Sequence, residues 1–160
     1  MSVLPRLREL LDGHGVPYTV LTHPLPRSAG ATARAVALPT RELAKAVGVR
    51  HRGVMSLAVL PSHARVDLPR LSAALRAPVE LAPEPEIAAA FPECEPGAMP
   101  PFGGLYGLKT YIDESLTHDR QITFPAGTHT AAIRMGFEDY RRVAAPVVLW
   151  LAESLASAEG

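Results

Sequence analysis

Proline is the residue that most limits how this chain can fold, since 16 of its 160 residues are proline. Its ring fixes φ and removes a backbone donor, which ends helices and keeps the residue out of central strands. The passage Glu95–Gly104 holds three prolines and three glycines, so it can be neither a regular helix nor a central strand. We therefore expect many short elements joined by stiff connections.

Between the prolines, apolar residues recur at helical spacing in several segments. A capping residue stands at the start of two of them, Ser2 and Asp67. The last segment carries Trp150, which at this spacing is expected in the core. The predicted helices are Ser2–Leu11, Ala31–Leu38, Asp67 to about Leu75, Glu84–Phe91, a helix starting at Phe137, and Val147–Ala158.

Other segments are short and rich in β-branched residues. Two of them flank a turn that contains Gly53, which is typical of a hairpin. The predicted strands are Tyr18–Leu21, Val47–Arg50, Val54–Leu60, Val79–Leu81, Lys109–Asp113, Gln121–Phe124 and Thr130–Met135. Strands and helices do not alternate regularly and no repeat occurs, so we expect one α+β domain over residues 1–160 with a mixed sheet.

Composition excludes several classes of protein. Sixteen basic residues balance 16 acidic ones, which argues against a strongly basic nucleic-acid-binding tail. No apolar run is long enough to cross a membrane, and Met1–Glu9 is too charged for a signal peptide, so we expect a cytoplasmic protein. Cys94 is the only cysteine, which excludes an internal disulfide.

The six histidines show no metal-binding spacing, so we expect neither metal nor cofactor. Of the six, His129 is kept as a site candidate because it follows Gly127 by two residues. Lysine is rare here: the chain has Lys45 and Lys109 against 14 arginines. Lysine is a compact point charge whose pKa shifts on burial, so each of the two lysines is a candidate functional residue. An ordinary exposed lysine at a helix-to-strand junction would also explain Lys45. Lys109 is expected at the surface.

In its order of segments the sequence resembles the YbaK/ProX family of aminoacyl-tRNA deacylases, whose domain is also the editing insert of bacterial prolyl-tRNA synthetases. The resemblance runs from about Leu10 to about Val148. It rests on four segments in order: Glu42–Lys45, Gly97–Gly103, the strand ending at Asp113, and Phe124–Gly127. In two places the sequence departs from the family pattern. Ala46 follows the lysine where threonine is common, and Arg34 stands where an acid is common, which leaves the choice of substrate open.

The resemblance implies a barrel-like mixed sheet flanked by helices and a definite activity. Such domains hydrolyse the ester that joins an incorrect amino acid to the 3′ end of tRNA, and the substrate's own 2′-hydroxyl is thought to assist the attacking water. The implied partners are aminoacyl-tRNA and, as a candidate, an aminoacyl-tRNA synthetase, without DNA or membrane. A small amino acid is expected, because rejection of a larger cognate one is a steric task.

Roles for individual residues follow from the same resemblance. Lys45 would orient the terminal adenosine and phosphate, and the backbone amides between Gly97 and Pro101 would bind near the ester carbonyl. Gly127 matches the glycine of a second loop. The substrate-binding residues implied or retained as candidates are Tyr18, Met99, Pro100, Phe102, Asp113 and His129.

Two other functions stay open on the sequence alone. The first is a non-catalytic module of the same fold that binds an aminoacyl end, an amino acid or a nucleotide; Ala46 and Arg34 motivate it. The second is an ester hydrolase that acts on small metabolites, which would be indifferent to the tRNA moiety.

Overall fold

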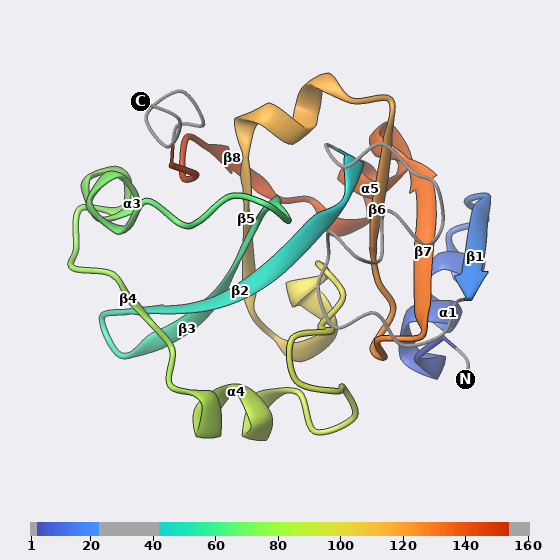
Figure 1. Ribbon diagram of the computed structural model, residues 1–160, viewed down its shortest axis with the longest axis horizontal. Helices are drawn as coiled ribbons and strands as arrows, with labels where there is room; N and C mark the ends of the chain where they lie inside the picture. Colours follow the sequence, from blue (N-terminus) through green and yellow to red (C-terminus); the bar gives the residue numbers. More distant parts are fainter. Residues whose placement is uncertain (1–2, 23–41, 154–160) are drawn as a thin grey trace.

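A computed structural model describes residues 3–22 and 42–153, in which short strands form two sheets (Figure 1). An antiparallel sheet has the order β1-β7-β6, and a mixed sheet has the order β4-β2-β3-β5-β8. The strands are β1 (Tyr18–Thr22), β2 (Ala44–His51), β3 (Val54–Pro61), β4 (Glu80–Leu81), β5 (Lys109–Asp113), β6 (Gln121–Pro125), β7 (Ala131–Gly136) and β8 (Val147–Leu149). The predicted α+β class with a mixed sheet is confirmed, although the described strands form two open sheets and no closed barrel.

A short bridge joins the two sheets. Leu43, directly before β2, pairs in parallel with Thr123 of β6. The start of β2 therefore lies beside β6, while its other end runs out to the hairpin tip (Figure 1). This places Lys45 near the junction of the two sheets.

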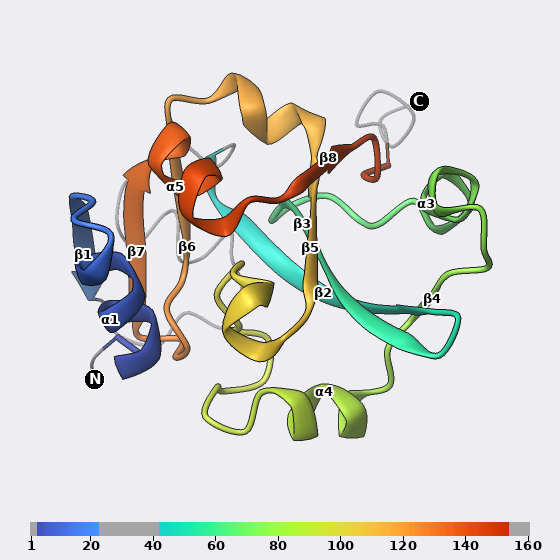
Figure 2. The same cartoon turned by 180° about the vertical axis from the view of Figure 1, so that it is seen from behind.

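The helices lie around the sheets (Figures 1 and 2). α4 lies below the β2–β3 hairpin, and α5 packs against β6 and β7. The α-helices are α1 (Pro5–Gly13), α3 (Leu68–Leu75), α4 (Glu84–Ala90) and α5 (Phe137–Ala144), and two 3₁₀ helices are η2 (Gly103–Tyr106) and η3 (Glu114–His118). None of the helices in the described part of the chain is long and apolar enough to cross a bilayer.

Of the two helix starts that a capping residue predicted, one is confirmed and the other is not. The Asp67 side chain accepts a hydrogen bond from the Arg70 amide (3.0 Å), so the predicted cap of α3 is confirmed. The predicted start of the first helix at Ser2 is wrong. The helix begins at Pro5, and Leu4 occupies the cap position without a side-chain bond. The fixed φ of proline suits the first helical position, which explains why the helix begins there.

The predicted hairpin is confirmed and is longer than expected. β2 and β3 pair in antiparallel register from Ala44↔Pro61 to His51↔Val54. The two turn residues have positive φ angles, 52° at Arg52 and 76° at Gly53, as a type I′ hairpin turn requires. The eight-residue strand β2 supplies part of the pocket wall described below.

The predicted C-terminal helix is wrong in its described part, residues 147–153. Val147–Leu149 is the edge strand β8, parallel to β5, and Trp150 is 61% exposed rather than in the core. The carboxylate of Asp113 accepts bonds from the amides of Leu151 and Ala152, both 2.9 Å, which holds the chain extended at this point. The predicted helix Ala31–Leu38 lies outside the described residues.

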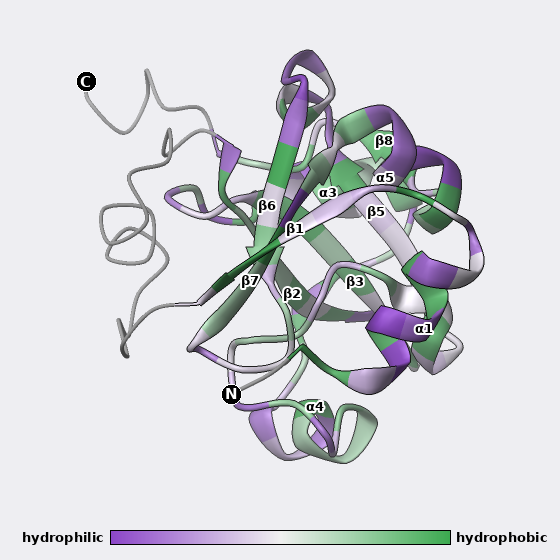
Figure 3. Cartoon of the chain, turned by 90° about the vertical axis from the view of Figure 1, so that its right-hand side faces the viewer, coloured by the Kyte–Doolittle hydropathy of each residue, from purple (hydrophilic) through white to green (hydrophobic). Residues whose placement is uncertain are grey.

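The largest core cluster packs α1, α5 and the three-stranded sheet together. Phe102 lies in it with its ring centroid 5.4 Å from that of Phe124 and 5.1 Å from that of Tyr140. α1 buries Leu7 and Leu11 completely, and its hydrophilic turns face outward (Figure 3). A separate, smaller cluster around Phe91 and Met99 lies between α4 and the hairpin.

Candidate functional site

Two loops that the sequence singled out lie side by side. We call Glu95–Phe102 the proline loop and Ala126–Thr130, after β6, the glycine loop. The Glu95 amide donates to the Gly127 carbonyl (2.9 Å), and the Gly127 amide donates to the Ala98 carbonyl (3.0 Å). The two loops are thus joined by a short backbone ladder, although 23 residues separate them in sequence.

His129 fastens the two loops a second time. Its amide donates to Glu95 Oε1 (2.6 Å), and its Nε2 lies 2.6 Å from the Pro96 carbonyl oxygen. A carbonyl oxygen only accepts, so Nε2 is the protonated nitrogen of this ring. His129 therefore holds the proline loop in place, and it does not line the pocket described below.

The backbone conformation of these two loops requires glycine at one position in each. Gly97 has φ +80° and Gly127 has φ +100°, a region that L side chains rarely adopt. A Cβ on Gly127 would lie 3.0 Å from the Leu4 Cβ, whereas one on Gly97 would meet only His129 at 3.7 Å. Gly127 is thus restricted by both conformation and space, because α1 packs directly against it.

The proline loop presents amides without acceptors. Among residues 3–22 and 42–153, neither the Gly97 amide nor the Met99 amide has a hydrogen-bond acceptor. In contrast, six carbonyls of the loop accept bonds from other groups, namely those of Glu95, Pro96, Ala98, Pro100, Pro101 and Phe102. The two vacant amides are donors that the loop offers to a ligand oxygen.

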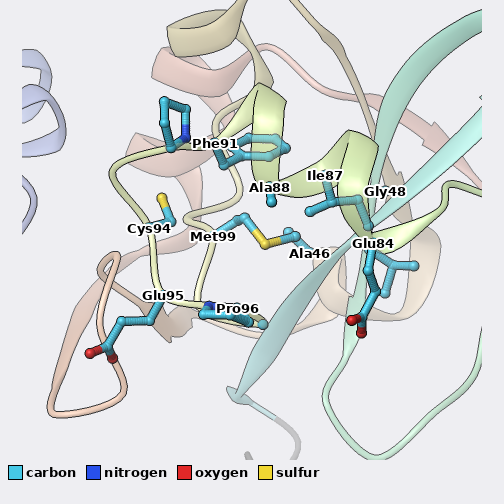
Figure 4. A pocket seen from close by; sticks show the side chains of 13 residues that line it. Ala46, Gly48, Glu84, Ile87, Ala88, Phe91, Cys94, Glu95, Pro96 and Met99 are labelled. Atoms are coloured by element: carbon cyan, nitrogen blue, oxygen red, sulfur yellow. The ribbon is translucent and has the colours of Figure 1, made fainter.

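A pocket of about 350 Å³ opens between β2, α4 and the proline loop (Figure 4). Gly97 and Met99 line it, so the vacant amides belong to residues of its wall. Its other walls are mainly apolar and include Ala46 from β2 and Ile87 and Phe91 from α4. This volume is at the lower end of the usual range for small-molecule sites.

Lys45 is next to the pocket and does not line it. It precedes Ala46 on β2, and because side chains alternate along a strand, the two point to opposite faces. Lys45 is half-buried, and no carboxylate in the described part of the chain pairs with it. Burial lowers the pKa of Lys45, and the nearby positive charge of Arg65 lowers it further.

The remaining predicted residues have positions outside the pocket lining. Phe102 belongs to the aromatic core, and Pro100 and Pro101 are buried. The Pro101 carbonyl accepts a hydrogen bond from the hydroxyl of Tyr140 (2.8 Å), which anchors the end of the proline loop. Burial strongly raises the pKa of Tyr140, so this hydroxyl stays protonated as a donor.

Tyr18 and Asp113 make structural contacts. Tyr18 on β1 donates its hydroxyl hydrogen to Asp12 (2.8 Å), and its pKa is raised mainly by burial. Asp113 is 4% exposed, and its carboxylate accepts from the amides of Leu151 and Ala152 and from Ser115. These bonds occupy both oxygens of Asp113 and tie β5 to the C-terminal segment.

Several pocket residues were missed at the sequence level. Ala46, Ile87 and Phe91 carry no chemistry of their own, and only the departure at Ala46 gave a signal. Cys94 also lines the pocket, with its sulfur 3.5 Å from the Tyr106 hydroxyl oxygen. Burial raises the pKa of the Cys94 thiol, so it is a poor nucleophile. In the described part of the chain no three His, Cys, Asp or Glu side chains are grouped to hold a metal.

Residues 23–143 match the model of the aminoacyl-tRNA editing domain. This span is most of the chain and contains β2, the proline loop and the glycine loop. The chain therefore belongs to the aminoacyl-tRNA editing domain family.

Solved structures share the fold at low identity. One is called a "putative trans-editing enzyme for prolyl tRNA synthetase" (22% identity, 96% of this chain, 100% of that chain, TM-score 0.81). Another is the hypothetical protein APE2540 (18% identity, 92% of this chain, 99% of that chain, TM-score 0.84). A scaffold protein used for epitope grafting is 24% identical over 93% of this chain and 96% of that chain, with a TM-score of 0.80. No curated protein matches the sequence.

Proposed function

We propose that this protein hydrolyses the ester bond of a tRNA that carries an incorrect small amino acid, acting apart from the synthetase that made it. The observation that carries the proposal is the pair of amides, Gly97 and Met99, that have no acceptor among the described residues, in a loop most of whose carbonyls are occupied. Both residues line a pocket of a size suited to one aminoacyl group. Membership of the editing family supports tRNA as the carrier.

The amides would stabilise the charge that develops on the ester carbonyl oxygen. Backbone donors held by a fixed loop reorganise little during the reaction, and loss of one such donor typically slows a reaction by about 10²- to 10³-fold. The ladder to Gly127, the contacts of His129 and the Tyr140 bond fix this loop. An ester has a fair leaving group, so a positioned water, assisted by the substrate's 2′-hydroxyl, completes the chemistry without a protein nucleophile.

Lys45 would hold the 3′ end of the tRNA rather than the amino acid. Its side chain lies on the face of β2 opposite Ala46, near Arg65 and without a carboxylate partner in the described residues. A half-buried cation in this state is suited to an anionic ligand such as a phosphate. We assign the terminal phosphate to Lys45 on this basis.

The test compares Lys45→Ala with Lys109→Ala, the change at the other, exposed lysine. Release of labelled amino acid is followed from tRNAs charged with alanine, serine or cysteine. Loss of a charge-assisted hydrogen bond is worth about 1.5–3 kcal/mol, so Lys45→Ala should lose about 10- to 100-fold in kcat/KM, whereas Lys109→Ala should match the wild type. Full activity in folded Lys45→Ala would contradict the role of Lys45.

A second candidate function is a module that binds the aminoacyl end without cleaving it. The pocket lining supports it, since its ionisable side chains are Glu84, Glu95 and the half-buried thiol of Cys94, none placed as an evident base. Tight binding of charged tRNA without release of any amino acid would favour this function over hydrolysis.

A further inference from the structure

Among the residues that the structure describes, the pocket wall opposite the proline loop carries no hydroxyl or amide side chain. Resting on the proposed function, we infer that this pocket selects an apolar aminoacyl side chain over a hydroxylated one of the same shape. We also infer that Ala46 is the residue that sets this preference. Ala46 comes from β2 and packs with Leu57, Phe91 and Met99 in one apolar cluster.

The polar side chains in the lining either form hydrogen bonds with other parts of the protein or are exposed to solvent. Glu95 accepts the His129 amide, and its carboxylate points away from Ala46 and Met99 (Figure 4). The Cys94 sulfur lies within hydrogen-bond distance of Tyr106. Glu84 is exposed at the start of α4. Under the proposed function the ester carbonyl engages the Gly97 and Met99 amides, so a substrate hydroxyl beside Ala46 would lose its water without gaining a side-chain partner, which costs free energy.

The end of the pocket is closed by α4. A Cβ on Gly48 would lie 3.1 Å from Ile87 Cγ1 and 3.2 Å from Ile87 Cδ1, so the isoleucine packs directly over the glycine. Because Gly48 has no side chain, Ile87 reaches the strand beside Ala46. Apolar atoms thus face a bound side chain from both β2 and α4.

The expected discrimination is moderate. An apolar pocket disfavours a substrate that adds a hydroxyl to an otherwise identical shape by up to about 10²-fold. From one tRNA charged in turn with each amino acid, we expect higher kcat/KM for 2-aminobutyrate than for serine, and for valine than for threonine. The ratio should be about 10- to 100-fold in each isosteric pair that fits.

A matched pair of variants assigns this preference to Ala46. Ala46→Thr and Ala46→Val add nearly the same volume to the wall, and only the former adds a hydroxyl. Both should lower turnover by filling the pocket, but Ala46→Thr should reduce the apolar-to-hydroxyl ratio by about 10-fold, whereas Ala46→Val should keep the wild-type ratio. Equal ratios in the two variants would overturn the role of Ala46.

Circular dichroism shows whether the Ala46 variants fold. If they do not, Ile87→Thr and Ile87→Val supply the same comparison from the α4 side, and only Ile87→Thr should lower the apolar-to-hydroxyl ratio of kcat/KM. The wild-type measurement separates the two levels of the proposal. Release of hydroxylated substrates as fast as their apolar partners would overturn the selectivity alone. No release from any charged tRNA would overturn the proposed hydrolysis and the selectivity with it.

Discussion

Gly127→Ala tests whether the glycine loop holds the site together. The new alanine would have to adopt φ +100°, and its Cβ would lie 3.0 Å from the Leu4 Cβ. Rotation of the backbone would relieve the strain but would break the bonds of Gly127 to Ala98 and Glu95. Backbone strain of this kind costs about 1–3 kcal/mol, and an overpacked contact costs about as much again. The sum is about 2–6 kcal/mol.

The measurement is thermal unfolding, with Gly53→Ala as the matched control. Gly53 also has positive φ (+76°), but a Cβ there would meet nothing within 4 Å. In a domain of this size 1 kcal/mol shifts Tm by about 2–4 °C, so Gly127→Ala should lower Tm by about 4–24 °C, whereas Gly53→Ala, which carries the backbone strain alone, should lower it by about 2–12 °C. Equal shifts in the two variants would refute the steric argument.

Two further predictions concern buried charge. Asp113→Ala leaves the amides of Leu151 and Ala152 without their acceptor, so it should lower the free energy of unfolding by at least about 2 kcal/mol in urea titrations. The comparison is Asp139→Ala at the partly exposed Asp139–Arg142 pair, which should cost about 1 kcal/mol or less. An equally small effect of Asp113→Ala would contradict the anchoring role. Lys45→Met should stabilise the fold at pH 7, because burial lowers the pKa of Lys45 below 10.5 and so penalises its charged form. That gain should shrink as pH rises through the lowered pKa and past 10.5, above which the lysine is neutral in both states; a constant gain would contradict the assignment.

Most of the fold could be predicted because its signals are local. The alternation of apolar residues and the glycine at position 53 are enough to define the hairpin, and Asp67 marks the start of α3. The segment after Ala145 could not be predicted in this way. Its apolar residues fit helical spacing, but the bonds that hold it extended come from β5 and from Asp113, far away in sequence.

The candidate site could be predicted in part. The motifs named two loops, and the structure brings these loops together, but a motif does not show which of its residues face a ligand. Phe102 belongs to the same motif as Gly97, yet it packs in the aromatic core and anchors the loop from behind. The apolar wall from α4 had no signal at all, because Ile87 and Phe91 look like ordinary core residues in a sequence.

Because the chain has zero net charge, electrostatic attraction for tRNA has to come from local positive charges rather than from the protein as a whole. Several arginines are neutralised by carboxylates that do not line the pocket, as in the pairs Arg6–Glu93, Arg50–Glu80 and Arg134–Glu42. Lys45 has no such partner among the described residues, although half-burial and the proximity of Arg65 make its charge unfavourable for folding. A cation that costs stability and has no carboxylate partner in the described part of the chain supports the proposal that a ligand phosphate pairs with Lys45. Each phosphate contact adds to the affinity for tRNA and to its salt dependence. The single local charge of Lys45 is therefore in line with the proposed recognition of the aminoacylated end rather than of the whole tRNA.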